Sequence, residues 1–266
     1  MALVDTSRDL VSCEIQRGVA TIVLRRSDKL NSMNNAMIGQ LMSALDEACD
    51  AARVAVIRAE PGVRVFSAGH DLSEVAAGFD DPALWDNPVE SLLAGLPRRP
   101  IPVIAAVEGS VWGAACNLVV AADLVVACHD ATFAITPAKL GVPYFDDGVA
   151  AFLAALPVHI AKEMFLTARP LSAEDAHRWG MVNRLVADEA ELTEVVAHMA
   201  ATIAELAPLT LRTVKAQFAA MTASRPADEA ERAELLALRQ QAWRSEDFRE
   251  GVAAFGERRT PEFEGR

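Results

Sequence analysis

The chain has 266 residues, of which 52% are hydrophobic and 23% charged, and its formal net charge is −12. This length is enough to bury a sizeable core in one domain with a helical extension, and the composition is typical of a soluble globular protein. The net negative charge argues against non-specific nucleic-acid binding but is compatible with a phosphorylated small ligand. The sequence shows neither a membrane span nor a signal peptide. We therefore expect a cytoplasmic protein without nucleic-acid or membrane partners.

The cysteines and histidines show no spacing typical of a metal site. We interpret the cysteines as ordinary thiols in a reducing compartment and expect neither a metal nor a cofactor. The cysteines are Cys13, Cys49, Cys116 and Cys128, and the histidines are His70, His129, His159, His177 and His198.

The first half of the chain alternates short apolar segments with helical patterns. The pattern predicts a hairpin, a helix, two strands, a short helix, a loop over the site, and then a strand, a helix and a strand. These elements are expected at 12–26, 34–52, 53–58, 65–66, from residue 71, 79–89, 100–107, 113–122 and 124–127.

After Gly148 the patterning becomes almost wholly helical, with a short apolar stretch at residues 185–186. Strands alternating with helices favour a largely parallel sheet covered by helices, so the fold class is α/β. The expected helices are 148–156, 158–168, 172–178, 189–206, 208–222 and 227–243.

Two glycine-rich turns follow buried strands, at S-A-G-H-D (67–71) and at V-E-G-S-V-W-G-A-A (107–115). Such turns could direct the backbone amides of His70 and Ala114 to one point, which would form an oxyanion hole for the enolate or tetrahedral oxyanion of a thioester or ester. Small residues at 113–115 would let a ligand approach the backbone closely. The alternative is that both glycines merely serve tight turns.

Tyr144 is the only tyrosine of the chain and ends the segment G-V-P-Y. Its phenol could donate a hydrogen bond to a carboxylate or carry a proton, and Thr136 in A-I-T-P could be a second neutral donor. Both could equally be structural residues. The ring of His70 could act as an acid or base, but we favour a role for its amide.

The carboxyl-terminal segment 255–266 places basic residues beside aromatic ones, which could hold phosphate and adenine or could form a solvated tail. The dinucleotide-binding, P-loop, nucleophile-elbow and zincin motifs do not occur in their expected context. Those enzyme classes are therefore not first choices.

Together these segments resemble the crotonase (enoyl-CoA hydratase/isomerase) superfamily over essentially the whole chain. The resemblance rests on K-L-N-S-M (29–33), F-S-A-G-H-D-L (66–72), 100–115, 121–127, 166–183 and R-R-T-P-E-F (258–263). It implies a core of repeated ββα turns over residues 1–200 and a helical region over 201–266 that assembles homotrimers or homohexamers.

The resemblance also implies an acyl-CoA thioester as the substrate. The amides of His70 and Ala114 would form the oxyanion hole, with Gly113 beside them. Main-chain groups near Lys29, Leu30 and Ala68 would receive the adenine and pantetheine parts.

Two departures from the superfamily pattern bear on the reaction. Hydratases carry two catalytic glutamates, and the matching positions here are Asn117 and Pro137. Neither residue can act as a general acid or base, and Glu108 lies outside both positions, so hydration is disfavoured. The strings G-S-V-W-G, T-F-A-I-T-P-A-K-L-G-V-P-Y and R-S-E-D-F-R-E-G resemble the methylmalonyl-CoA decarboxylase family, although Ala114 replaces a glycine usual there.

That resemblance implies contact of Tyr144 with the substrate carboxylate and a nearby Thr136. Our hypothesis is a biotin-independent, metal-free decarboxylation of methylmalonyl-CoA, or a close homologue, through an enolate, with Tyr144 or water as the proton donor. The alternatives are an enoyl-CoA hydratase or isomerase with another base, and a non-catalytic acyl-CoA-binding protein.

Overall fold

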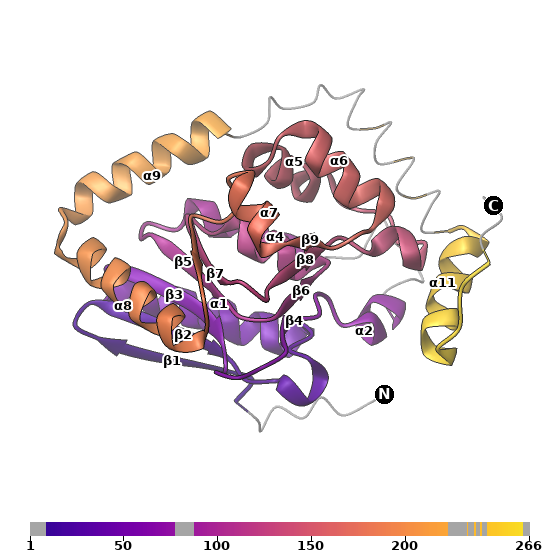
Figure 1. Cartoon of the computed structure of the whole chain (residues 1–266), viewed down its shortest axis with the longest axis horizontal. Coiled ribbons are helices and arrows are strands. Elements are labelled where there is room, and N and C mark those ends of the chain that lie inside the picture. The colour runs from indigo at the N-terminus through magenta and orange to yellow at the C-terminus, as the bar shows by residue number, and fades with distance from the viewer. Residues whose placement is uncertain are drawn as a thin grey trace.

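The computed structural model describes residues 9–77, 88–222, 233, 237, 240 and 244–262. The described strands form two sheets, with helices packed around them (Figure 1). The larger sheet has the order β1-β2-β3-β5-β7-β10, and the smaller has the order β4-β6-β8-β9. The strands are β1 (Val11–Gln16), β2 (Val19–Leu24), β3 (Val54–Ala59), β4 (Val65–Ser67), β5 (Val103–Val107), β6 (Ser110–Trp112), β7 (Leu124–Cys128), β8 (Thr132–Ala134), β9 (Leu171–Ser172) and β10 (Arg184–Val186).

The order of the strands shows that the chain winds as a spiral. Strands β3, β5 and β7 are parallel neighbours in the larger sheet, and β4, β6 and β8, which follow each of them directly, are parallel neighbours in the smaller sheet. Each turn therefore places one strand in each sheet before a helical segment. This arrangement confirms the predicted α/β class with repeated ββα turns.

The helices cover the sheets and fill the second half of the chain. The larger helices are α1 (Asn35–Ala51), α2 (Leu72–Ala77), α3 (Pro88–Gly95), α4 (Ala114–Ala121), α5 (Asp146–Ala155), α6 (Val158–Thr167), α7 (Ala173–Arg178), α8 (Glu189–Glu205), α9 (Pro208–Thr222) and α11 (Glu246–Glu257). Short 3-10 turns occur at η1 (Ser27–Lys29), η2 (Leu96–Arg98) and η3 (Pro137–Leu140).

The central strands β3, β5 and β7 of the larger sheet are buried on both faces, which explains their continuous apolar sequences. Side chains alternate between the faces along each strand. In β3, Ala55 and Ile57 join the main core, whereas Val54 and Val56 pack with α8. This agrees with the predicted largely parallel sheet covered by helices.

The structure corrects several expected boundaries. Pro88 and Val89 begin α3 and do not belong to the expected loop, whose residues 79–87 lie outside the described part of the chain. Strands β6, β8 and β9, of two or three residues each, were not predicted, whereas β4 (Val65–Ser67) was expected at 65–66. Most of the expected helix 227–243 also lies outside the described residues.

Helix α9 extends along one side of the molecule, away from α8 (Figure 1). Its Lys215 is only 6% exposed, and the ammonium group donates to the carbonyl of Ile101 at 2.9 Å and to the Asp123 carboxylate at 2.6 Å. Burial lowers the pKa of Lys215, and Asp123 opposes that effect. These contacts attach α9 to the segments that directly precede β5 and β7.

Other residues of α9 face solvent, among them Leu209 at 75% exposure and Met221 at 82%. Within the described residues, a single helix with the length and apolarity to cross a membrane is not found; α8 and Pro208–Ala219 reach that requirement only as a pair bent by 108°.

Candidate active site

The two glycine-rich turns meet in the folded chain. Gly69 has a φ of +85°, and a Cβ atom built on it would lie 2.5 Å from the carbonyl oxygen of Trp112 and 3.0 Å from the amide nitrogen of Ala114. Only glycine permits this approach together with that backbone conformation. The turn before His70 therefore lies directly against the start of α4, as the sequence predicted.

The hydrogen bonds of the neighbouring backbone determine the direction of the His70 amide. Met33 donates to the carbonyl of Gly69 at 2.7 Å, and Asp71 donates to the carbonyl of Met33 at 3.0 Å. The carbonyl of Gly69 and the N–H of His70 belong to one trans peptide and point in opposite directions, so the N–H of His70 points away from Met33. That direction is toward the side on which β6 and the start of α4 lie.

The second amide, that of Ala114, belongs to the first residue of α4. The first N–H groups of a helix have no acceptor within the helix, and the helix dipole favours negative charge there. Gly113, which precedes it with a φ of +54°, turns the chain from β6 into α4. The two predicted amides thus come from segments in contact.

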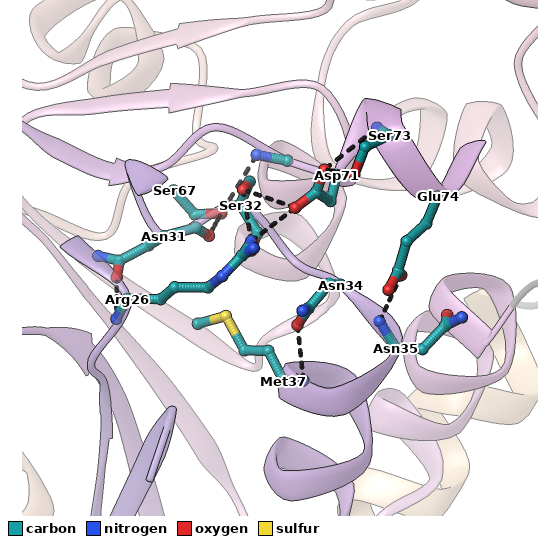
Figure 2. A network of polar contacts seen from close by, with 11 residues as sticks. Arg26, Asn31, Ser32, Asn34, Asn35, Met37, Ser67, Asp71, Ser73 and Glu74 are labelled. Carbon is teal, nitrogen blue, oxygen red and sulfur yellow. Dashed lines mark hydrogen bonds and ion pairs between the residues drawn. The ribbon is translucent and has the colours of Figure 1, made fainter. Parts of the chain in front are cut away.

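A polar network holds the segment that carries His70 (Figure 2). The guanidinium of Arg26 donates to the Asp71 carboxylate at 2.7 Å and to the Ser32 carbonyl at 2.7 Å. Partial burial of Asp71 opposes its ionisation, but hydrogen bonds from Ser73 and Arg26 prevail and lower the pKa of the carboxyl group. Asp71 is therefore an ionised anchor, engaged on the side of Arg26.

Asn31 extends this network to the strand before His70 (Figure 2). It is fully buried, accepts from the Arg26 amide at 2.8 Å and donates to the Phe66 carbonyl at 3.0 Å. The hydroxyl of Ser67 donates to the Asn31 carbonyl at 2.7 Å and accepts from the Gly69 amide at 3.2 Å. The turn is thus restrained by hydrogen bonds from Arg26 and Asn31 and by one within the turn itself.

The segments predicted to receive coenzyme A are also adjacent. The amide of Ala68 donates to the carbonyl of Leu30 at 2.9 Å, and Lys29 precedes Leu30 in the same turn. Leu30 is 55% exposed and has a φ of +54°, which is uncommon for a leucine. An exposed apolar side chain therefore stands beside the turn that leads to His70.

Tyr144 lies against the same turn of the chain as Ala114. Its hydroxyl is 3.4 Å from the carbonyl oxygen of Gly113 and hydrogen-bonds the side-chain oxygen of Asn117. Its ring stacks on Phe145 and meets Phe165 edge-on, each at a centroid distance of 5.0 Å. Burial, and to a lesser extent the Cys116 thiol, raises the pKa of Tyr144, so the phenol stays protonated at neutral pH.

Thr136 follows β8, whose last residue, Ala134, accepts from the Gly113 amide at 2.8 Å. It immediately precedes η3, where Pro137 is the first residue. Thr136 and Tyr144 therefore belong to two segments that both contact Gly113.

The ring of His70 is uncharged at neutral pH. Burial lowers its pKa to about 4, although the nearby Asp71 carboxylate acts in the opposite direction. A neutral, buried imidazole contributes little positive charge to an oxyanion. This agrees with a role for the amide of His70 in preference to its ring.

The two positions that hold glutamates in hydratases contain residues with structural contacts. Asn117 is 1% exposed and donates to the carbonyl of Gly148 at 2.9 Å, while Pro137 opens η3. The carboxylate of Glu108, which lies between β5 and β6, accepts from the Gly62 amide at 3.0 Å. The sequence identified Asn117 only as a departure; its contacts with α5 and Tyr144 depend on segments about 30 residues away and left no local signal.

The basic carboxyl-terminal segment is partly engaged by its own helix. Arg259 donates to both oxygens of the Glu250 carboxylate, at 2.5 and 2.7 Å, and to Glu257 at 2.6 Å. The hydrogen bonds from Arg259 lower the pKa of Glu250 to about 2. Arg259 is therefore already ion-paired, and residues 263–266 lie outside the described part of the chain.

Comparison with known proteins places these features in a wider group. A model of the family "Enoyl-CoA hydratase/isomerase" matches residues 14–266. Methylmalonyl-CoA decarboxylase of Escherichia coli K12 is 36% identical over 248 residues, which are 93% of this chain and 95% of that protein. Carnitinyl-CoA dehydratase of Salmonella typhi is 37% identical over 217 residues, 80% of this chain and 82% of that protein.

A solved structure of methylmalonyl-CoA decarboxylase in complex with 2-nitronate-propionyl-CoA superposes with a TM-score of 0.93. It is 34% identical in sequence, and the match covers 98% of this chain and 100% of that one.

Proposed function

The chain belongs to the enoyl-CoA hydratase/isomerase (crotonase) family, and on that premise we propose that it decarboxylates a malonyl-type coenzyme A thioester. The expected reaction converts methylmalonyl-CoA to propionyl-CoA without biotin or a metal. The observation that carries the proposal is the contact of the Gly69 turn with the start of α4. In the same helix the buried side chain of Asn117 occupies a position where a hydratase needs a glutamate.

In the proposed reaction the thioester oxygen accepts hydrogen bonds from the amides of His70 and Ala114. The carboxylate lies between Thr136 and Tyr144, which orient it. The bond between the carboxylate carbon and Cα breaks, CO₂ leaves, and the electron pair becomes an enolate whose charge rests on the thioester oxygen. Each oxyanion-hole donor contributes about 3–4 kcal/mol in comparable sites, so two donors supply a large part of the barrier reduction.

This chemistry needs no base to remove a proton from carbon, which suits the residues found. Asp71 is engaged by Arg26 and Ser73, and Glu108 by the Gly62 amide. A neutral phenol and a hydroxyl suffice to orient a carboxylate.

A second candidate is hydration, dehydration or isomerisation of an unsaturated acyl-CoA. The 37% identity with carnitinyl-CoA dehydratase of Salmonella typhi favours it. An inert acyl-CoA-binding protein is the third possibility. The first two differ in the thioester they consume, and the third consumes none.

The test is a mass-spectrometric assay of the purified protein with methylmalonyl-CoA, malonyl-CoA and crotonyl-CoA, without added metal or biotin. Loss of CO₂ from a malonyl-type substrate with crotonyl-CoA untouched is the expected result. Hydration of crotonyl-CoA with both malonyl thioesters intact would refute the proposal, and binding without turnover would point to the third possibility.

Variants then test the proposed residues. We expect Thr136→Val to lower kcat. The matched control is Thr132→Val, which should keep the wild-type kcat; Thr132 lies in β8, and its hydroxyl donates to the hydroxyl of Ser110 at 3.1 Å. Unchanged turnover in Thr136→Val would remove this residue from the mechanism.

We further propose that coenzyme A lies along Lys29, Leu30 and Ala68, and that the helical region 201–266 assembles trimers or hexamers. The exposed apolar side chains of Leu209, Phe218 and Met221 on α9 support such an interface. Light scattering at several concentrations measures the assembly state directly.

A further inference from the structure

The orientation of the Asn117 side chain is determined by its neighbours. Its nitrogen contacts the carbonyl oxygen of Gly148 at 2.9 Å, and its oxygen contacts the hydroxyl of Tyr144. A carbonyl oxygen accepts hydrogen bonds only, so the NH₂ group must face Gly148. The amide oxygen must then face Tyr144.

The phenol of Tyr144 has a single proton, and in the part of the chain that the structure describes its oxygen has two hydrogen-bonding contacts, both with acceptor atoms. These are the side-chain oxygen of Asn117 and the carbonyl oxygen of Gly113, the latter at 3.4 Å. The hydroxyl must therefore act as the donor in these contacts. Its proton points into the protein.

Close packing holds the ring in this position. A Cβ atom on Gly148 would lie 2.7 Å from ring atoms of both Tyr144 and Phe145. Phe165 meets the Tyr144 ring edge-on. The ring therefore has little room to turn its hydroxyl away from Asn117.

We infer that Asn117 is a positioning residue that keeps the proton of Tyr144 on the protein side, so that the phenol neither donates to the substrate carboxylate nor protonates the enolate. The inference rests on the proposed function and refines it. Tyr144 then orients the carboxylate by shape, and the hydroxyl of Thr136 is the hydrogen-bond donor.

Two physical consequences favour this division of roles. A Tyr144 that gave up its proton would leave a phenolate facing two acceptor oxygens, which is unfavourable, and burial already raises the pKa of this phenol. A carboxylate with few hydrogen bonds is also less stabilised before CO₂ leaves, whereas neutral CO₂ does not need them.

The proton that completes the product then comes from water. The carboxylate carbon leaves with its two oxygens as CO₂, and its bonding pair stays on the substrate as the enolate. Cα takes a proton from water, and the hydroxide formed combines with CO₂ to give bicarbonate. Methylmalonyl-CoA and water thus yield propionyl-CoA and bicarbonate, with atoms and charge in balance.

Because the chain contains one tyrosine, ¹³Cζ-labelled tyrosine gives a single NMR resonance that reports on this hydroxyl. The probes are 2-carboxypropyl-CoA, a thioether that bears the carboxylate, and propyl-CoA, which lacks it. We expect both to leave the wild-type resonance in the same position. In Asn117→Leu, which removes the acceptor, only the carboxylate ligand should move it.

The same variant should bind 2-carboxypropyl-CoA about 10- to 100-fold more tightly relative to propyl-CoA, because the released phenol can donate to a charged group. With methylmalonyl-CoA, KM and kcat should both fall, whereas a merely structural defect would lower kcat without lowering KM. Asn117→Asp, which retains an acceptor, should keep the wild-type resonance pattern.

A wild-type resonance that moves with the carboxylate ligand, and not with propyl-CoA, would overturn the inference, even if Asn117→Leu failed to fold. The resonance requires no turnover. A wild-type protein that retains the Tyr144 proton but does not decarboxylate would refute the proposed function alone. One that decarboxylates while Tyr144 donates to the carboxylate would refute this inference alone.

Discussion

Acidification should destabilise the folded chain through the buried ring of His70. Burial lowers the pKa of this imidazole from 6.5 to about 4, so below pH 6.5 the unfolded chain binds a proton that the folded chain excludes. Stability is therefore lost as the pH falls through the unfolded value of 6.5, and the loss levels off below the folded value of about 4.

The magnitude follows from the two pKa values. The full loss is about 3 kcal/mol, because each pKa unit corresponds to about 1.4 kcal/mol. Between pH 8 and pH 5 this residue alone should cost about 2 kcal/mol, which is a substantial part of the stability of an ordinary domain.

Urea denaturation at intervals from pH 8 to pH 5 measures the effect. Other groups also titrate in this range, so the informative quantity is the difference between wild type and His70→Gln, which should shrink by about 2 kcal/mol over that interval. His159→Gln, at an exposed histidine, is the matched control for the change of side chain. Parallel curves for wild type and His70→Gln would refute the reasoning.

Three further predictions concern contacts that hold the site in place or attach α9. Gly69→Ala should abolish most activity, since its methyl group would lie 2.5 Å from the Trp112 carbonyl oxygen at a φ of +85°; steady-state kinetics with a retained circular dichroism spectrum would check this, and wild-type kinetics would contradict it. Arg26→Met should lower kcat and the melting temperature by freeing Asp71, the residue directly after His70, whereas Arg25→Met, at a side chain 49% exposed, should do neither. Lys215→Met should cost about 2–3 kcal/mol in urea denaturation, below the range for a fully buried pair because its partner is 28% exposed; a loss under about 0.5 kcal/mol would show that this contact does not attach α9.

The amino-acid sequence alone determined the fold class and most of the longer elements. Apolar side chains at helical spacing predicted the helix at 34–52, and the structure has α1 at Asn35–Ala51 with Asn34 as its cap. The continuous apolar segments became β3, β5 and β7, because a sheet covered on both faces needs apolar residues at every position. The family resemblance was confirmed by the match over residues 14–266.

Most of the short strands could not be predicted from the sequence pattern, although β4 was expected at residues 65–66. A segment of three residues, such as Thr132–Ala134, is too short to show the alternation of a strand. Its pairing with β6 depends on how successive ββα turns stack in the folded chain. The restraints on the His70 segment were hidden for a related reason. Arg26 and Asp71 are 45 residues apart, and no local propensity links them.

The clearest division concerns Asn117 and Tyr144. The sequence identified both residues and showed that an amide occupies a glutamate position. Only the folded chain brings Gly148, Asn117 and Tyr144 into one line of hydrogen bonds. The residue types determine which groups can donate and accept, but the direction of a proton depends on which groups meet, and that is decided by tertiary packing.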